Sequence, residues 1–407
     1  MGVSVFAKLR YIHARDVGDL CKILLTWLPG RLLRRRDPHI WLVSERPDDA
    51  HDNGYWFFRY LRTAHPEQHA YYVIRPDAPD AARVRALGPI LAHGSWKHHV
   101  YFWAAEKNIS AHVGNGFPAN LMCRQLLMHG AYSFQNIFLQ HGIIKETPPF
   151  LLREVNRIDL FITSAERERD AVIRDLGYRP EQVCCTGLCR YDGLAAPQVK
   201  PKQILIMPTW RWWLTPEYGQ PPEQALEKVR ASAYLHAWND LLGSEQLAGF
   251  LEENDLTVLF FPHSEMQPFL AEFRVASPRI RVIDGKTYDV QQALIESALL
   301  VTDYSSIFFD FAYMDKPLIY YQFDREEYFT RHYPEGYFSF DNDGYGPVAR
   351  TGDGVVEQMI AAYRADFAVD PLYRQRAEAF FRYRDTENCR RNYEAVRDFA
   401  LPHFRKG

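Results

Sequence analysis

Short apolar runs alternate with helical patterns along most of this chain. Residues 55–61 have helical spacing, and the runs before the chain midpoint are typical of buried strands: 40–43, 71–74, 108–111, 137–140 and 160–163. The alternation pauses at 195–202, which contains Pro and Lys, and five further runs follow: 204–207, 258–261, 280–283, 299–302 and 318–321. Strands that alternate with helices predict parallel α/β layers. We therefore expect α/β domains at 37–196 and 197–370, followed by a helical segment at 371–407.

The first 36 residues have a different pattern. Five apolar residues fall at helical spacing: Leu20, Ile23, Leu24, Trp27 and Leu28. The segment holds eight basic residues, Lys8 and Arg10 among them, against only two acidic ones. This predicts an amphipathic segment on an anionic membrane surface. The alternative is a helix packed on its own domain, with a solvated basic run after it.

Length and composition narrow the class of protein. A chain of 407 residues is long enough for two domains, and its net charge of −3 does not indicate nucleic-acid binding. The six cysteines lack zinc-site spacing and indicate reduced thiols. No apolar run approaches the roughly 20 residues of a membrane span, and the apolar core of a secretory signal is missing. We expect a peripheral protein on the cytoplasmic face of the membrane.

The most informative motif follows the apolar run that ends at Thr302. Asp303 and Tyr304 come next, then Ser305 and Ser306, and then a segment with helical character. Unpaired N–H groups at a helix N-terminus, together with two hydroxyls, are suited to a phosphate or pyrophosphate. An ordinary helix cap is the alternative, because Ser and Asp are the commonest capping residues.

Three other predicted strands also end in polar residues. His141 and Gly142 follow one strand with Lys145 close behind, and the other two ends carry Thr209 with Arg211, and His263. Ligands of open parallel sheets bind outside the carboxyl ends of strands, so we expect one polar crevice for a phosphorylated ligand. No phosphate-binding loop of the G-x-x-x-x-G-K-[ST] type occurs. Residues 341–344 (Asp-Asn-Asp-Gly) fit a turn better than a metal site.

Taken together, these motifs resemble the CDP-glycerol glycerophosphotransferase family, which includes teichoic acid primases and polymerases and capsule-type members. The resemblance covers about Ile40 to Val396 and rests on five segments in order: His141-Gly142 with Lys145, Thr186-Gly187-Leu188-Cys189-Arg190-Tyr191-Asp192, Pro208-Thr209-Trp210-Arg211, Pro262-His263, and Val301 to Ala312 with Lys316 to Asp324. It implies a GT-B-type fold, in which two Rossmann-like domains face each other across a cleft.

The resemblance also implies an activity and roles for residues. The activity is transfer of an alditol phosphate, glycerol phosphate above all, from a CDP-alditol donor to a hydroxyl of a lipid-linked or polymeric acceptor, with release of CMP. His141 would be the general base and His263 a second essential histidine at the pyrophosphate. The residues expected at the donor are Arg211, Thr209, Asp303, Ser305, Ser306, Lys145 and Gly187. We expect neither a cofactor nor a metal.

Three departures from the family pattern leave the acceptor and the alditol open. Cys189 stands in place of Pro, Gln140 in place of Trp, and Ile143-Ile144 in place of Thr-Pro. Two other functions also remain open: a nucleotide-sugar glycosyltransferase on the same fold, and a non-catalytic scaffold for lipid-linked intermediates. The release of CMP, rather than UDP or GDP, distinguishes the first of these, and a lack of any turnover favours the second.

Overall fold

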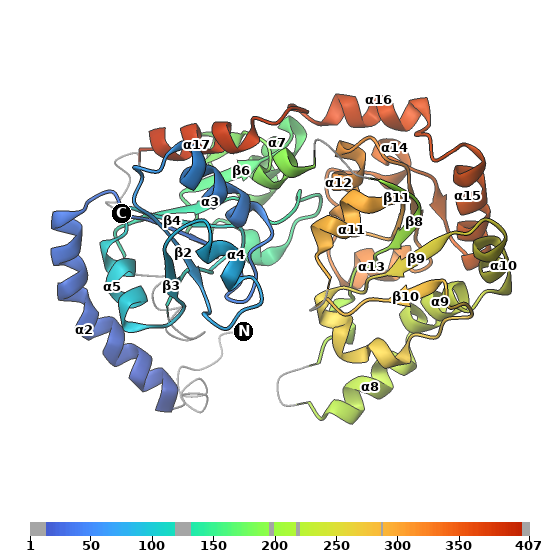
Figure 1. The fold of residues 1–407 in the computed structure, drawn as a ribbon, viewed down its shortest axis with the longest axis horizontal. Helices are drawn as coiled ribbons and strands as arrows, with labels where there is room; N and C mark the ends of the chain where they lie inside the picture. Colours follow the sequence, from blue (N-terminus) through green and yellow to red (C-terminus); the bar gives the residue numbers. More distant parts are fainter. Residues whose placement is uncertain (1–13, 119–131, 195–198, 217–219, 286–287, 401–407) are drawn as a thin grey trace. The chain divides into compact units, whose positions relative to one another are not determined.

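The computed structural model describes residues 14–118, 132–194, 199–216, 220–285 and 288–400 (Figure 1). By its internal contacts the chain divides into two units. The first comprises Met1–His141, Pro149–Gly193 and Asp385–Gly407, and the second comprises Gly142–Pro148 and Leu194–Arg384. Of the predicted boundary stretch, 195–198 lies outside the described residues, as do Lys8 and Arg10.

The first unit is built on a parallel sheet of seven strands in the order β3-β2-β1-β4-β5-β6-β7. The strands are β1 (Trp41–Ser44), β2 (Ala70–Ile74), β3 (Ile90–Ala92), β4 (Lys107–Ser110), β5 (Gln135–Phe138), β6 (Leu160–Thr163) and β7 (Val183–Cys185). Its helices are α2 (Ala14–Arg36), α3 (Asn53–Ala64), α4 (Ala81–Arg85), α5 (Trp96–Ala104), α7 (Glu166–Leu176) and α17 (Asn388–Asp398), with 3₁₀ turns η1 (Pro149–Leu151), η2 (Pro180–Gln182) and η3 (Cys189–Gly193).

The second unit holds a parallel sheet of six strands in the order β10-β9-β8-β11-β12-β13. They are β8 (Lys200–Ile206), β9 (Thr257–Phe260), β10 (Ile280–Val282), β11 (Ser297–Thr302), β12 (Leu318–Tyr321) and β13 (Val348–Ala349). The helices are α8 (Pro222–Arg230), α9 (Ala233–Leu242), α10 (Glu245–Glu253), α11 (Val290–Glu296), α12 (Ile307–Tyr313), α13 (Arg325–Arg331), α14 (Phe340–Asp343), α15 (Gly352–Arg364) and α16 (Pro371–Phe380), with 3₁₀ segments η4 (Trp212–Leu214) and η5 (Ser264–Glu272).

Both strand orders are of the Rossmann type, in which the order reverses beside the first strand. The reversal lies between β1 and β4 in the first sheet and between β8 and β11 in the second. The prediction of two parallel α/β units is therefore confirmed. The position of each reversal matters for function, because loops at the carboxyl ends of the two strands diverge there and leave room for a ligand.

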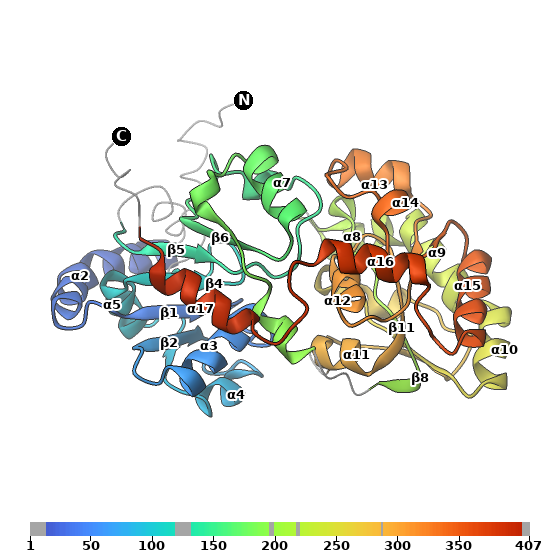
Figure 2. The same ribbon diagram turned by 90° about the horizontal axis from the view of Figure 1, so that it is seen from above.

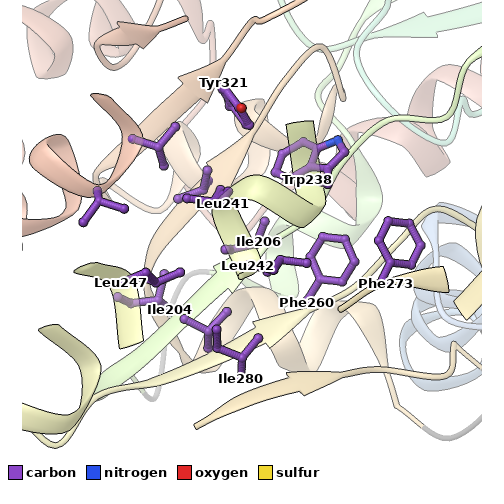
Figure 3. Packing of buried hydrophobic residues seen from close by; sticks show 14 of the residues in the cluster. Ile204, Ile206, Trp238, Leu241, Leu242, Leu247, Phe260, Phe273, Ile280 and Tyr321 are labelled. Carbon is purple, nitrogen blue, oxygen red and sulfur yellow. The ribbon is translucent and has the colours of Figure 1, made fainter. Parts of the chain in front are cut away.

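An apolar cluster under α9 fixes the second sheet (Figure 3). Trp238 and Leu241 of α9 are fully buried against Ile206 of β8 and Phe260 of β9. The Trp238 ring meets that of Tyr321 in β12 edge to face at 5.1 Å. Burying each such side chain contributes on the order of 1.5–3 kcal/mol. This packing holds the carboxyl ends of β8, β9 and β12 in fixed register.

Helix α2 packs lengthwise on α5 in the first unit (Figure 1). Ile23, Thr26 and Gly30 are buried on the face toward α5, and the Trp103 indole donates a hydrogen bond to the Ile23 carbonyl at 3.0 Å. A side chain at Gly30 would overlap Trp103. The predicted apolar face therefore divides, because Ile23 faces protein while the other four members are exposed.

The expected C-terminal helical segment consists of two helices (Figure 2). Helix α16 packs with α12 in the second unit, whereas α17 packs with α3 and η3 in the first. In α17, Cys389, Tyr393 and Val396 join the apolar core of the first sheet. The chain thus returns to its first unit at the end.

Candidate active site

Three of the four polar strand ends lie together in the second sheet. Strands β9, β8 and β11 are neighbours, and they lead into His263, Thr209 and Asp303 respectively. Thr209 and Asp303 flank the point where the strand order reverses, the usual ligand position in this type of sheet. The fourth end, His141, follows β5 in the first sheet. The candidate residues therefore form two groups, one in each unit.

Asp303 ties the ends of β8 and β11 together. Its side chain is fully buried, and Oδ1 accepts hydrogen bonds from the backbone N–H groups of Thr209 and Tyr304, both at 2.7 Å. The expected role of Asp303 at the donor stays a prediction. The carboxylate faces inward and fixes the loop that carries Thr209.

Arg211 is likewise buried, and its guanidinium group contacts two carboxylates and a backbone carbonyl of the protein. Its guanidinium forms ion pairs with Asp303 at 2.9 Å and Asp324 at 2.7 Å, and it donates to the Thr209 carbonyl at 2.8 Å. Burial alone would lower the pKa of Arg211, but the two carboxylates raise it above its ordinary value and keep the group charged. In the structure the guanidinium belongs to an internal ion-pair network, and the expected role of Arg211 at the donor phosphates stays a prediction.

Hydroxyl groups remain available at the same edge of the sheet. Ser306 is the N-cap residue of α12, yet its side chain makes no capping bond, and Ser305 and Ser306 are both half-buried. The Thr209 hydroxyl is buried and, within the described residues, has no hydrogen-bond partner. Helix α12 has only seven residues, so its dipole alone does not indicate an anion site. The hydroxyl groups are what indicate a ligand here.

His263 lies at the end of β9 against an aromatic side chain. Its ring stacks on Trp210 at a centroid distance of 5.9 Å, and its Nδ1 accepts the Glu265 backbone N–H at 3.2 Å. The ring is half-buried. Because Nδ1 accepts this bond, the Nε2 atom is the one that bears the proton in the neutral ring.

Lys145 belongs to the short segment that packs with the second unit. Its side chain is buried and pairs with Glu146, which also accepts a hydrogen bond from the Tyr328 hydroxyl at 3.4 Å. A side chain at Gly336 would overlap the Lys145 carbonyl. The structure therefore groups Lys145 with the second unit and pairs its ammonium group with Glu146, and its expected role at the donor stays a prediction.

The backbone at His141 is held in an unusual conformation. The preceding residue, Gln140, is fully buried with φ of 63°, a left-handed conformation that side chains rarely adopt. Asn53 donates to the Gln140 carbonyl at 2.9 Å and accepts from the Arg190 backbone at 2.9 Å. Arg190 in turn donates to the His141 carbonyl at 2.5 Å and pairs with Asp52 at 2.8 Å. Strain is therefore maintained at this position by several bonds, as is typical of functional sites.

The His141 ring is exposed and stacks on His112 at a centroid distance of 4.9 Å. The pKa of His141 is lowered to about 4, chiefly because the surrounding protein desolvates the ring. Asp52 opposes this shift, whereas Arg46 and Arg190 add to it. Because the ring is exposed, water offsets part of this penalty, and the direction is what matters. At neutral pH the ring is uncharged and able to accept a proton.

Gly187 has a conformational function. Its φ is 84°, and a side chain there would overlap Asn388. Asp192, five residues on, accepts the backbone N–H groups of Asn388 and Cys389 at 2.9 and 2.8 Å and so caps α17. In the structure Gly187 allows the close approach of Asn388 and so helps to join the C-terminal helix to the first unit, and its expected role at the donor stays a prediction.

Several residues at these sites were not predicted from the sequence. Asn53, His112 and His332 carried no recognisable signal, whereas Arg190 and Asp324 stood inside quoted motifs and could have been found there. Within the described ranges, no group of three or more His, Cys, Asp or Glu side chains is arranged to hold a metal ion.

Comparison with known proteins identifies the family. Residues 30–398 match the family of CDP-glycerol:poly(glycerophosphate) glycerophosphotransferases. The chain is 29% identical over 367 residues to the minor teichoic acid biosynthesis protein GgaB of Bacillus subtilis, covering 88% of this chain and 39% of GgaB. It is 29% identical over 177 residues to the teichoic acid poly(glycerol phosphate) polymerase of the same organism, covering 42% of this chain and 21% of that protein.

The fold is similar to that of solved structures. The wall teichoic acid polymerase TagF superposes with a TM-score of 0.63 at 16% identity, over 98% of this chain and all of that chain. The UDP-GlcNAc 2-epimerase of Neisseria meningitidis superposes with a TM-score of 0.50 at 10% identity, over 88% of this chain and all of that chain. The chain spans well under half the length of both curated relatives. By the match over residues 30–398, it belongs to the CDP-glycerol:poly(glycerophosphate) glycerophosphotransferase family.

Proposed function

We propose that this protein transfers an alditol phosphate, glycerol phosphate first of all, from a CDP-alditol donor to a hydroxyl of a lipid-linked or polymeric acceptor. The observation that carries the proposal is the family match across both units, residues 30–398. The acceptor oxygen forms a new bond to the phosphorus that bears the alditol, the bond from that phosphorus to the CMP oxygen breaks, and CMP leaves. No change of oxidation state is involved.

Each unit supplies one part of this reaction. An alcohol is a poor nucleophile until a base takes its proton, and a neutral His141 is suited to accept that proton. The second unit supplies hydrogen-bond donors for the pyrophosphate, namely Ser305, Ser306, the buried Thr209 hydroxyl and His263. Phosphoryl transfer otherwise depends on positioning and on stabilising charge. We assign the acceptor to the unit around 37–196 and the CDP donor to the unit around 197–370.

Turnover tests the proposal directly. We expect purified protein to release CMP from CDP-glycerol in the presence of a glycerol-phosphate-primed acceptor, with products sized by mass spectrometry. A parallel assay with CDP-ribitol identifies the alditol. Release of UDP or GDP from a nucleotide sugar, with no CMP, would instead favour a glycosyltransferase. No nucleotide release from any donor would favour a non-catalytic binding scaffold.

The serine hydroxyls can be tested against the capping alternative. We expect the double variant Ser305→Ala/Ser306→Ala to lose roughly tenfold or more in affinity for CDP-glycerol, because a hydrogen bond to a charged group contributes about 1.5–3 kcal/mol. Its stability should change little, since the Ser306 side chain caps nothing. Calorimetry with the donor and thermal unfolding measure the two effects.

Ser244 is the matched control. It caps α10 by accepting the Leu247 backbone N–H at 3.3 Å. Ser244→Ala should therefore lower the unfolding free energy by about 1 kcal/mol and leave donor affinity intact. Unchanged donor affinity in the double serine variant would return Ser305 and Ser306 to an ordinary structural role.

We further propose that α2 attaches the protein to the anionic cytoplasmic face of the membrane. Its exposed side carries Leu24, Leu25 and Leu28, which are 68%, 65% and 58% exposed, and Trp27. Arg31, Arg35 and Arg36 are exposed at its C-terminal end. Apolar burial at the interface and basic residues near an anionic surface both favour binding. No helix among the described residues has the length and apolar character to cross a bilayer.

Point substitutions test this attachment better than truncation, because removing α2 would uncover α5. We expect Leu24→Gln/Leu28→Gln to weaken co-sedimentation with phosphatidylserine vesicles severalfold, and raised salt to weaken the wild type as well. Leu372→Gln, at a residue 50% exposed on α16, is the control and should sediment like the wild type. Equal sedimentation of all three proteins would mean that the exposed face of α2 does not bind membranes.

A further inference from the structure

His332 follows the last turn of α13 and lies between two aromatic side chains. Its ring stacks on Tyr328 with centroids 4.7 Å apart and an interplanar angle of 19°, and it meets Trp210 edge to face at 4.8 Å. The Trp212 backbone N–H donates to His332 Nδ1 at 3.0 Å. Three contacts from two separate segments thus fix both the position and the rotation of this ring.

The hydrogen bond at Nδ1 determines where the proton lies. In a neutral imidazole one nitrogen accepts and the other donates, so a ring that accepts at Nδ1 carries its proton on Nε2. This tautomer is assigned from the hydrogen bond. Nε2 is not enclosed, and across the described ranges it has no protein partner. The fixed ring therefore presents a hydrogen-bond donor that the fold itself does not use.

The surroundings of His332 belong to the candidate donor site. Trp210 separates it from His263, whose ring stacks on the same indole. Burial lowers the pKa of His332 most, and Arg211, Lys145 and His263 lower it further, to about 3. The ring is thus neutral at pH 7, which makes it a donor and not a base.

We propose that His332 is a donor-binding residue, whose Nε2–H group hydrogen-bonds to a phosphate oxygen of the CDP-linked substrate beside His263. The inference rests on the proposed function, because the substrate is the one assigned there. It adds a third histidine to the two that the motifs predicted. Unlike His141, it takes no proton during transfer.

Two variants distinguish hydrogen bonding from packing. His332→Phe keeps an aromatic ring between Tyr328 and Trp210 but has no donor, whereas His332→Gln loses the ring and keeps an N–H₂ group near the Nε2 position. We expect His332→Phe to weaken CDP-glycerol binding by roughly 10- to 100-fold in calorimetry, the range for a hydrogen bond to a charged group. His332→Gln should recover most of that loss, and cytidine, which lacks phosphate, should bind all proteins equally.

The control is His236→Phe, at an exposed histidine of α9 in the same unit, which should bind CDP-glycerol like the wild type. Thermal unfolding of each variant reports folding separately. Wild-type affinity in His332→Phe would overturn the inference and leave the proposed function standing, as would equal losses in the Phe and Gln variants or a parallel loss of cytidine binding. Failure of the wild type to bind CDP-glycerol would overturn the proposed function, and this inference with it.

Discussion

Replacing His141 by alanine should lower kcat by roughly 10²- to 10⁴-fold, the usual contribution of a positioned general base. Donor affinity should remain, because the residues assigned to the donor belong to the second unit. Single-turnover release of CMP measures the first effect, and calorimetry with CDP-glycerol measures the second. This separation matters, because loss of both would indicate a donor-binding role for His141.

The pH dependence gives an independent test of the same residue. A base must be unprotonated, and the pKa of His141 is lowered from 6.5 to about 4. Activity should therefore persist as pH falls through 6.5, so the acid limb of kcat/KM lies below the ordinary histidine range. Protonation of a histidine with an unshifted pKa would place this limb near pH 6.5.

His39→Ala is a suitable control, because His39 is an exposed histidine of the first unit, away from the strand ends. Its activity and pH profile should match those of the wild type. Near-normal turnover in purified, folded His141→Ala would remove His141 from the base role. His112, which stacks on His141, would then be the next candidate for the general base.

The sequence predicted most strands because short runs rich in apolar residues alternate with helical patterns. It missed β3, β7 and β13, which have three, three and two residues, although β10, also of three residues, was predicted. The break between α16 and α17 was also missed, since both halves have helical composition. These failures are local, and the alternating pattern still indicated two parallel sheets.

Prediction of the site was limited in a different way. Strand-end position identified His141, Thr209, His263 and Ser305 as polar residues at sheet edges, because that depends only on local pattern. It could not show which charges neutralise each other. From the sequence alone, Arg211 has no evident counter-ion. Its partner Asp324 lies far away in the sequence and contacts it only when β8, β11 and β12 form the sheet.

Arg211→Ala should therefore destabilise the second unit strongly, and should not act as a simple loss of donor affinity. Removing the guanidinium leaves Asp303 and Asp324 buried without their counter-ion, and breaking a buried pair in this way costs about 3–5 kcal/mol. The side chain also packs against the rings of Tyr304 and Tyr328, at 5.1 Å from each centroid, so a cavity adds to the loss. Urea titration followed by tryptophan fluorescence measures the unfolding free energy.

Arg274→Ala provides the matched control in the same unit. The Arg274 side chain is exposed, so its removal should change the unfolding free energy by no more than about 0.5 kcal/mol. The loss of unfolding free energy in Arg211→Lys should lie between those of Arg211→Ala and Arg274→Ala. An ammonium group retains the charge but cannot bridge both carboxylates with a planar fork. A stable Arg211→Ala protein that has lost only its affinity for CDP-glycerol would contradict this account. The guanidinium would then have to leave Asp303 and Asp324 and contact the donor phosphates itself.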